Sequence, residues 1–367
     1  MAEECYNQGV LFQNQGKYPE ALKAFDQAIA AQPDFYHAYF NRALILTQAG
    51  MLGEAFDDYN KAINLKPDLA AAYNNKGNIL KTWKKYHEAI QCYDQAINIQ
   101  PAFIEALNNK AATLNLVGKH EEAIQLCDQV IIFQPNYHKA YYNKGIGMEK
   151  LGNFEEALGC YTKSTEIKPD FTDGYHVKAY ALLDLGRYEE AIEVIEKLIE
   201  LKPGDFNPIF EKALLYQDLG KYEESLPILD QVISLKGDFF IAYQNKGVAF
   251  EKLGQLQDAI ACYSQAIEVN PNDSHSWYSK GLLYEKMGLY EESIESFDKG
   301  LMIMPHMAVG YNHKGIVLEK MGNLQEAKEC HQKAVALCPD VEFISSLENL
   351  VKKLEGKEEL MNEEKDD

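Results

Sequence analysis

Apolar residues recur along this chain at helical spacing, in two runs on either side of a central glycine. In residues 242–273 one apolar run precedes Gly254 and a second follows it, and Pro271 ends the second run. Apolar positions three and four residues apart form one face of a helix, and proline stops a helix because it lacks a backbone N–H. The segment therefore predicts two helices joined by a turn.

The same pattern returns every 34 residues. Nine of the twelve prolines are spaced by 34 or 68 residues, with Gly237 at the skipped position, and glycine keeps the same period except at Lys84. A fixed period of this length is typical of a repeat architecture and not of separate globular domains. The predicted units are residues 2–35, 36–69, 70–103, 104–137, 138–171, 172–205, 206–239, 240–273, 274–307 and 308–341.

Within a unit, counted from position 1 to 34, small residues hold fixed places. Position 8 is always Gly or Ala, and position 20 is always Ala or Ser, which allows two helices to approach closely. With aromatic residues at positions 4 and 24 and proline at 32, the pattern resembles the tetratricopeptide repeat (TPR). The resemblance implies an all-α fold, a right-handed α-solenoid of ten TPR helical hairpins whose first helices line a concave groove.

The ends and the middle of the repeat array depart from this pattern. Apolar residues at helical spacing predict a capping helix over residues 342–355, and the following residues 356–367 predict an acidic disordered tail. Pro208, Pro227 and Gly237 predict a looser joint near residues 203–240. No comparable cap precedes Ala2, so the first repeat is a candidate surface for self-association.

Composition narrows the classes of partner. The chain has 36 Lys+Arg against 56 Asp+Glu, a net charge of -20. Nucleic acid and anionic membranes would be repelled, so we expect neither, and polypeptide partners that are neutral or basic are favoured. The sequence shows neither a signal peptide nor an apolar run long enough to span a membrane, which predicts a cytoplasmic, intracellular protein.

Candidate catalytic and metal-binding groups are explained by helix packing. His87-Glu88 begins like a zinc-protease motif, but Gln91 stands where the second histidine belongs. The seven cysteines form no metal or disulfide pattern. A basic row at position 7 is expected to bury its stems and reach neighbouring acids. We therefore expect no enzyme activity and no cofactor.

Position 6 is the feature that packing does not require. It holds Asn7, Asn41, Asn75, Asn109 and Asn143, and again Asn245, although asparagine is a mediocre helix former. The row is similar to the asparagine ladder of the superhelical TPR domain of O-GlcNAc transferase. The resemblance implies that these amides bind the main chain of an extended polypeptide. The alternative is that each asparagine bonds to the backbone of the neighbouring repeat.

A second resemblance is to the carboxylate clamp of TPR co-chaperones. Asn78, Asn109 and Lys139 match three of its five positions, whereas Asn74 and Asn143 stand where the clamp needs cations.

Together these features predict a scaffold or adaptor that holds an extended polypeptide in the groove. Two other roles stay open. One is a non-catalytic, substrate-recruiting subunit of a transferase or chaperone complex, and the other is a structural component of a large assembly, with cytoskeletal or ciliary association.

Overall fold

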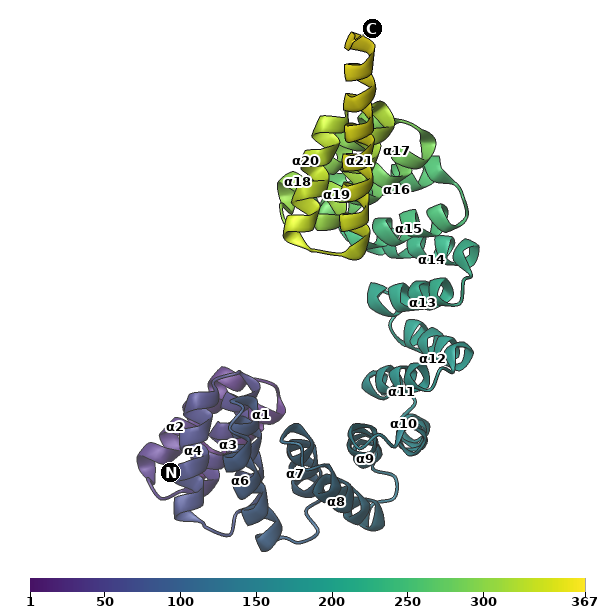
Figure 1. Ribbon diagram of the computed structural model, residues 1–367. Helices are drawn as coiled ribbons and strands as arrows, with labels where there is room; N and C mark the ends of the chain where they lie inside the picture. Colours follow the sequence, from purple (N-terminus) through teal and green to yellow (C-terminus); the bar gives the residue numbers. More distant parts are fainter. Residues whose placement is uncertain (367) are drawn as a thin grey trace. The chain divides into compact units, whose positions relative to one another are not determined.

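The chain is all helix in the part that is described. The structure is a computed structural model that describes the backbone of residues 1–366 and the side chains of residues 1–355, and within these bounds it contains twenty-one helices and no strand (Figure 1). Twenty of them form ten hairpins, each from a 13- or 14-residue first helix and a 14-residue second helix. The repeated-hairpin fold expected from the sequence is therefore confirmed.

The first helices are α1 Ala2–Asn14, α3 Tyr36–Gln48, α5 Ala70–Thr82, α7 Ile104–Leu116, α9 His138–Lys150, α11 Thr172–Asp184, α13 Phe206–Asp218, α15 Phe240–Lys252, α17 Ser274–Met287 and α19 Ala308–Met321. The second helices are α2 Tyr18–Ala31, α4 Leu52–Leu65, α6 Tyr86–Ile99, α8 His120–Phe133, α10 Phe154–Ile167, α12 Tyr188–Leu201, α14 Tyr222–Leu235, α16 Leu256–Val269, α18 Tyr290–Ile303 and α20 Leu324–Leu337. The last helix is α21, Val341–Asp366.

The chain divides into two compact units, Met1–Val194 and Ile195–Asp367. The division falls within α12, ahead of residues 203–240, where we expected a looser joint; those residues lie inside the second unit. Around them α13, α14 and α15 share a continuous apolar cluster that includes Ile209, Leu229 and Ala242. Pro227 lies inside α14 and does not end it.

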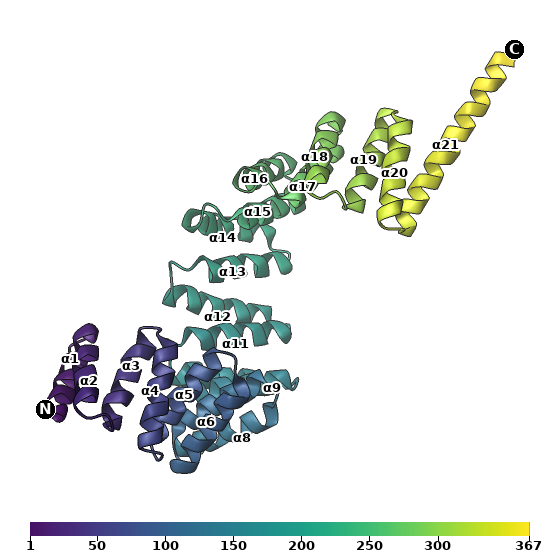
Figure 2. The same cartoon turned by 90° about the vertical axis from the view of Figure 1, so that its left-hand side faces the viewer.

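Within each unit the hairpins stack in chain order (Figure 2). Several successive first helices touch one another, such as α5 with α7 and α7 with α9 in the first unit, and α17 with α19 in the second. Among the described residues, successive second helices make no comparable contact. A stack that is tighter along one side curves toward that side. We call the surface formed by the first helices the first-helix face. It is the concave face of each unit.

In the hairpins whose position 8 is glycine, that residue closely approaches the side chain at position 24. A Cβ built on Gly77 would lie 2.6 Å from Tyr93 Cε1, and one built on Gly281 would lie 2.7 Å from Phe297 Cδ1. Where position 8 is alanine, position 24 is usually smaller, as in the pair Ala213 and Leu229. The two positions therefore share one fixed volume at the centre of the hairpin.

Gly281→Ala should lower the free energy of unfolding by about 1–3 kcal/mol, because the added methyl overpacks against the buried Phe297 ring. The double variant Gly281→Ala/Phe297→Leu has alanine and leucine at positions 8 and 24, as repeat seven has. Its loss of unfolding free energy should be smaller than the sum of the losses in the two single variants. Urea unfolding of the four proteins of this cycle gives the coupling. Strictly additive effects would contradict the shared-volume explanation.

The turn between the two helices requires a left-handed residue. Nine glycines in these turns have φ between 70° and 88°, and Lys84 adopts the same conformation with φ of 60°. A side chain in this region brings Cβ close to the following carbonyl oxygen, which is a cost that glycine avoids. Lys84 is thus the one strained turn residue in the described array.

Lys84→Gly should raise the free energy of unfolding by about 1 kcal/mol, because it removes this strain from an exposed site. Lys84→Ala is the matched control, since it removes the same charge and keeps a Cβ in the left-handed region. Thermal unfolding that shifts equally in the two variants would show that the charge and not the backbone is responsible.

Ion pairs from the position 7 row join successive repeats. Each basic residue reaches an acid at position 25 of the preceding repeat wherever the chain places one there, which confirms the expected role of this row. The pairs are Arg42–Asp26, Lys110–Asp94, Lys144–Asp128, Lys212–Glu196, Lys246–Asp230 and Lys314–Asp298. Where position 25 carries no acid, as before Lys178 and Lys280, burial lowers the pKa of the lysine.

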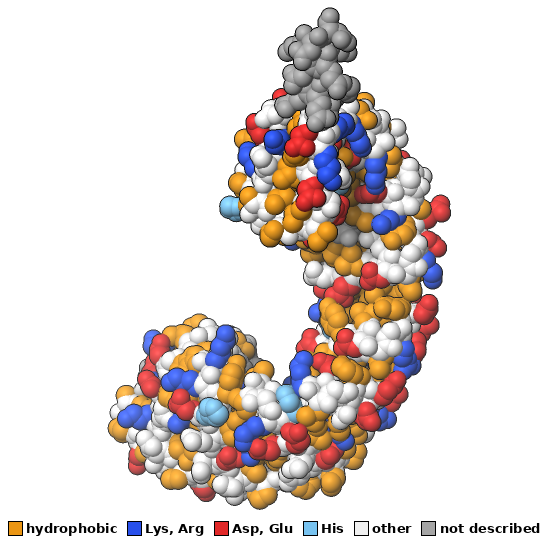
Figure 3. Space-filling model, in the orientation of Figure 1, with side chains coloured by type: hydrophobic (Ala, Val, Ile, Leu, Met, Phe, Trp, Pro, Cys, Tyr) orange, Lys and Arg blue, Asp and Glu red, His pale blue; other side chains and the backbone are white. Residues whose placement is uncertain are grey.

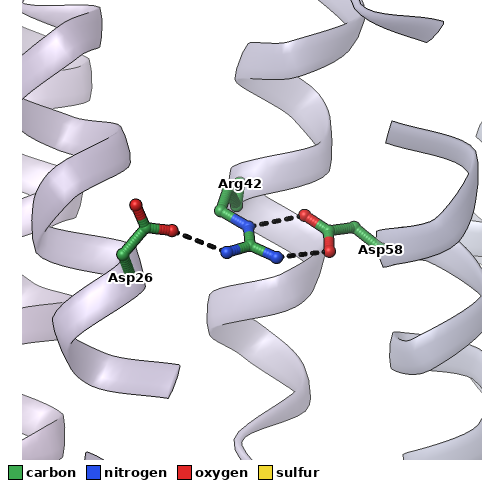
Figure 4. Close-up of polar contacts among 3 residues, drawn as sticks. All are labelled: Asp26, Arg42 and Asp58. Atoms are coloured by element: carbon green, nitrogen blue, oxygen red, sulfur yellow. Dashed lines mark hydrogen bonds and ion pairs between the residues drawn. The ribbon is translucent and has the colours of Figure 1, made fainter. Parts of the chain in front are cut away.

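Arg42 also binds a buried carboxylate within its own repeat. Its Nε and one terminal nitrogen donate to the two carboxylate oxygens of Asp58, at 2.7 and 2.6 Å, and the other terminal nitrogen donates to Asp26 at 2.6 Å (Figure 4). Asp58 is buried at position 23, where four other repeats place a cysteine. Arginine suits this place because its planar group binds a carboxylate through two parallel bonds.

The last helix covers the tenth hairpin. Leu350 is fully buried in a cluster with Leu318 and Leu324, and Leu354 packs against them. The helix α21 runs from Val341 to Asp366, so it extends beyond residue 355, where we expected the capping helix to end. The predicted acidic tail, residues 356–367, lies outside the residues whose side chains are described.

Candidate functional site

The position 6 asparagines lie on the first helices, with different degrees of exposure. Asn7 is exposed and Asn143 is buried, whereas Asn41, Asn75, Asn109 and Asn245 are half-buried. Burial of an amide requires hydrogen-bond partners, because an unpaired buried polar group costs free energy.

Three of these amides donate across the repeat boundary. Each bonds to the side chain at position 5 of the preceding repeat. The alternative interpretation, in which each asparagine bonds to the backbone of the neighbouring repeat, is therefore wrong for these three. The bonds run from Asn41 Nδ2 to Tyr6 Oη (2.8 Å), from Asn109 Nδ2 to Asn74 Oδ1 (2.9 Å) and from Asn143 Nδ2 to Asn108 Oδ1 (2.8 Å). An amide NH2 has two hydrogens, so each of these groups keeps one donor for another partner.

The other candidate residues have separate surroundings. Asn75 follows a repeat with Phe40 at position 5, so it has no cross-repeat bond of this kind; its Oδ1 accepts from Asn74 at 3.3 Å, and its amide interacts with the Tyr59 hydroxyl. Asn78 Oδ1 accepts from Tyr93 Oη at 2.9 Å. Asn245 Nδ2 donates to the Ile241 carbonyl oxygen within its own helix, at 2.8 Å. Asn75 and Asn245 therefore take no part in the cross-repeat bonds.

A pocket of about 360 Å³ opens on the first-helix face of the first unit. It spans three successive repeats, because α5, α7 and α9 each contribute to it. Its lining residues are Lys81, Thr82, Tyr86, Ala112, Asn115, Leu116, Asn143, Ile146 and Lys150. Apart from Tyr86, which begins α6, they occupy positions 6, 9, 12 and 13 of their repeats. We call it the groove pocket.

Asn115 shapes the wall of this pocket. Its Nδ2 donates to the main-chain oxygen of Asn143 at 2.8 Å, and its Oδ1 lies 3.2 Å from His120 Nδ1. In the second unit Gln217, at the same position 12, donates to the Asn245 main-chain oxygen in the same way, at 2.9 Å. These bonds fix the spacing of neighbouring first helices on the concave face.

The cations of the pocket are weakly neutralised. Lys81 is half-buried and forms no ion pair with a described carboxylate, and burial together with nearby Lys139 lowers its pKa. Lys150 pairs with Glu149 on its own helix at 3.3 Å. Figure 3 shows Lys, Arg, Asp and Glu side chains interspersed over the visible surface. Lys81 shares its lowered pKa with Lys178 and Lys280, which have no acid at position 25 of the preceding repeat.

Lys81 and the apolar lining of the groove pocket, Leu116 and Ile146, were not predicted from the sequence. One signal could have found Lys81. In the second unit, position 13 lysines pair with a position 12 glutamate of the preceding repeat, as in Lys286–Glu251 and Lys320–Glu285. Lys81 itself stands at position 12, and the residue 35 positions later, at position 13 of the next repeat, is Leu116. The sequence therefore places no acid opposite Lys81 at the distance that joins these pairs.

Lys81→Met should raise the melting temperature by a few degrees, because it removes a partly desolvated cation and keeps an unbranched apolar side chain. Lys286→Met, which removes a lysine already paired with Glu251, should leave the melting temperature unchanged or lower it. Circular dichroism melts of both variants test this. A lower melting temperature for Lys81→Met would show that its ammonium group is satisfied in the folded protein.

Comparison with known families agrees with the repeat geometry. Sequence models described as tetratricopeptide repeat match residues 6–73, 70–103, 92–125, 138–171, 172–205, 208–239, 240–273, 262–295 and 308–341. The chain belongs to the tetratricopeptide repeat family. TPR arrays serve typically as non-catalytic scaffolds, which supports a role in binding other proteins. No curated protein sequence matches this TPR chain.

Solved structures with similar helix stacking include three TPR-like examples. MamA 41-end from Desulfovibrio magneticus RS-1 is 22% identical, with 46% of this chain and 96% of that chain covered and a TM-score of 0.42. YrrB, described as a TPR protein with an unusual peptide-binding site, is 22% identical, with 52% and 98% covered and a TM-score of 0.42. The APC/C hetero-tetramer Cut9-Hcn1 is 17% identical, with 95% and 76% covered and a TM-score of 0.42.

Other chemistry was sought in the described part of this TPR protein. No described helix combines the length and apolar character needed to cross a bilayer. No three ligand-type side chains among the described residues converge to hold a metal ion. All seven cysteines are unpaired, and burial raises the pKa of Cys262 to about 11 and of Cys127 to about 12, so these two thiols are poor nucleophiles.

Proposed function

We propose that this protein is an interaction scaffold whose first unit binds an extended segment of another protein along the first-helix face. The observation that carries the proposal is the groove pocket, which crosses three successive first helices and has Asn143 in its wall. A segment lying across the helices would meet the same kind of side chain at each repeat.

Amides suit the main chain of an extended segment. Such a segment presents N–H and C=O groups at regular spacing, and an asparagine offers both a donor and an acceptor. The cross-repeat bonds of Asn41, Asn109 and Asn143 orient these amides before a ligand arrives, which reduces the entropy lost on binding. Asn75 lies in the same row without a cross-repeat bond of this kind, because Phe40 stands at position 5 of the preceding repeat.

The remaining candidates extend the same path. Asn7 lies at the first repeat. Asn78 precedes Lys81 on α5, Lys139 precedes Asn143 on α9, and Asn245 places one amide on the first-helix face of the second unit. The net charge of -20 favours neutral or basic partners for the chain as a whole.

Peptides selected from a random display library on the full-length protein test this role. Asn75→Ala should weaken their binding about threefold to tenfold, because the loss is that of one hydrogen bond to the peptide, roughly 0.5–1.5 kcal/mol. Gln125→Ala, at an exposed site on α8, is the matched control and should bind as the unmodified protein does. Fluorescence polarisation with labelled peptides gives both affinities.

Peptides that lose affinity with Gln125→Ala and keep it with Asn75→Ala would contradict the proposal. They would direct attention to the second-helix side, where Ile132 is 77% exposed, and to a role as a component of a larger assembly.

A further inference from the structure

We infer that the outer surface of α18, in repeat nine, binds a basic amphipathic helix of another protein. This surface belongs to a second helix of the second unit and shares no residue with the groove pocket, so the inference does not depend on the function proposed above. Met302 is its most exposed apolar residue, and Glu291 and Glu295 supply its negative charge.

The end of α18 is apolar where other repeats are polar. Position 29 holds Met302 and position 31 holds Met304, which are 77% and 40% exposed. Elsewhere position 29 is Ala, Asn, Ser or Glu, apart from Ile132 in repeat four, and position 31 is Gln, Lys or Asn, apart from Cys338 in repeat ten. Stacking of the repeats therefore requires methionine at neither place. An exposed methionine loses contact with water when a partner covers it, and its flexible side chain adapts to the partner's shape.

Met302 borders a pocket of about 430 Å³ that follows the length of α18. The other residues of its lining are Glu291, Ile294, Glu295, Asp298, Lys299 and Met321. Residues 291, 295, 298 and 302 are three or four positions apart, so they form one stripe along the helix. A partner helix lying beside this stripe would meet it with side chains at the same helical spacing.

The charges of the stripe favour a basic partner. Glu291 and Glu295 are exposed and form no ion pair with a described residue, whereas Asp298 already binds a lysine of α19. Burial lowers the pKa of Lys280, and Glu295 opposes this shift without contacting the ammonium group. Lys299 carries the one positive charge among the lining residues. Two carboxylates four residues apart therefore remain available to Lys or Arg side chains of a facing helix.

A second copy of this chain is a poorer occupant. Each copy carries a net charge of -20, so two copies repel each other, whereas a basic segment is attracted.

Repeat four provides a comparison on the same chain. Ile132 occupies the same position as Met302 and is also 77% exposed. Gln125, however, stands where α18 has Glu295, so the pair of acids is incomplete there. Ile132 therefore serves as the matched control for an exposed apolar side chain outside the proposed surface.

The test selects peptides on the full-length protein from a display library built on a fixed helical peptide with randomised surface positions. We expect a class with Lys or Arg at two positions four residues apart and with Leu, Phe or Met about seven residues from one of them, which is the spacing of Glu295 and Met302. Met302→Ser should weaken this class about tenfold, because a buried apolar contact is lost. Ile132→Ser should leave its affinity unchanged. Fluorescence polarisation gives the affinities.

Charge variants test the second element of the surface. Glu291→Gln/Glu295→Gln should weaken the same peptides about threefold to tenfold at low salt and reduce the dependence of their affinity on salt. Glu121→Gln/Glu122→Gln, which removes the same number of charges from α8, should change neither quantity. All of these side chains are exposed, so the variants should melt at the temperature of the unmodified protein.

Three results would overturn the inference. They are a selection with no class sensitive to Met302→Ser, a class equally sensitive to Ile132→Ser, and a class without enriched bases. Sedimentation equilibrium tests the other occupant, since a dimer that Met302→Ser dissociates would assign the surface to a second copy of the chain. Asn75→Ala should not affect the basic class, so failure of the groove variants and failure of the α18 variants are distinguishable.

Discussion

The close approach of the two helices of a hairpin is the constraint on which the stacking of the repeats depends. Position 8 is small because the side chain at position 24 fills the space between the helices, as Tyr93 does opposite Gly77. Once the hairpin is closed in this way, its remaining apolar surface faces the next repeat. A single hairpin cannot cover that surface alone, so stability comes from stacking.

Side-chain links at fixed sequence distances then determine how one repeat meets the next. Position 7 cations reach position 25 acids sixteen residues earlier, position 6 amides reach position 5 side chains thirty-five residues earlier, and position 12 amides reach a main-chain oxygen twenty-eight residues later. These links lie at the contacts between helices, where polar groups lose water and need partners. Where position 5 of the preceding repeat is apolar, as Phe40 is before Asn75, the position 6 amide lacks this cross-repeat link.

The two units use their concave faces differently. In the second unit the charged positions satisfy one another through the Glu–Lys ladder, and α21 continues that ladder with Lys353. In the first unit the face is rich in amides and contains Lys81 without an acid. Unsatisfied groups lower stability and favour ligands, so the same difference makes the first unit the better candidate for recognition.

The sequence alone determined the repeat and its hairpins, because period, glycine and proline act locally: Gly254 and Pro271 mark the turn and the end of a helix through backbone geometry. It also indicated the basic row and the asparagine row as features to explain. The tertiary structure decided which of their hydrogen bonds are used. Whether Asn109 bonds to Asn74, and whether Lys81 meets an acid, depends on which side chains successive helices bring together. These contacts join residues 28 to 35 positions apart that belong to different repeats, so the sequence of one repeat does not show them.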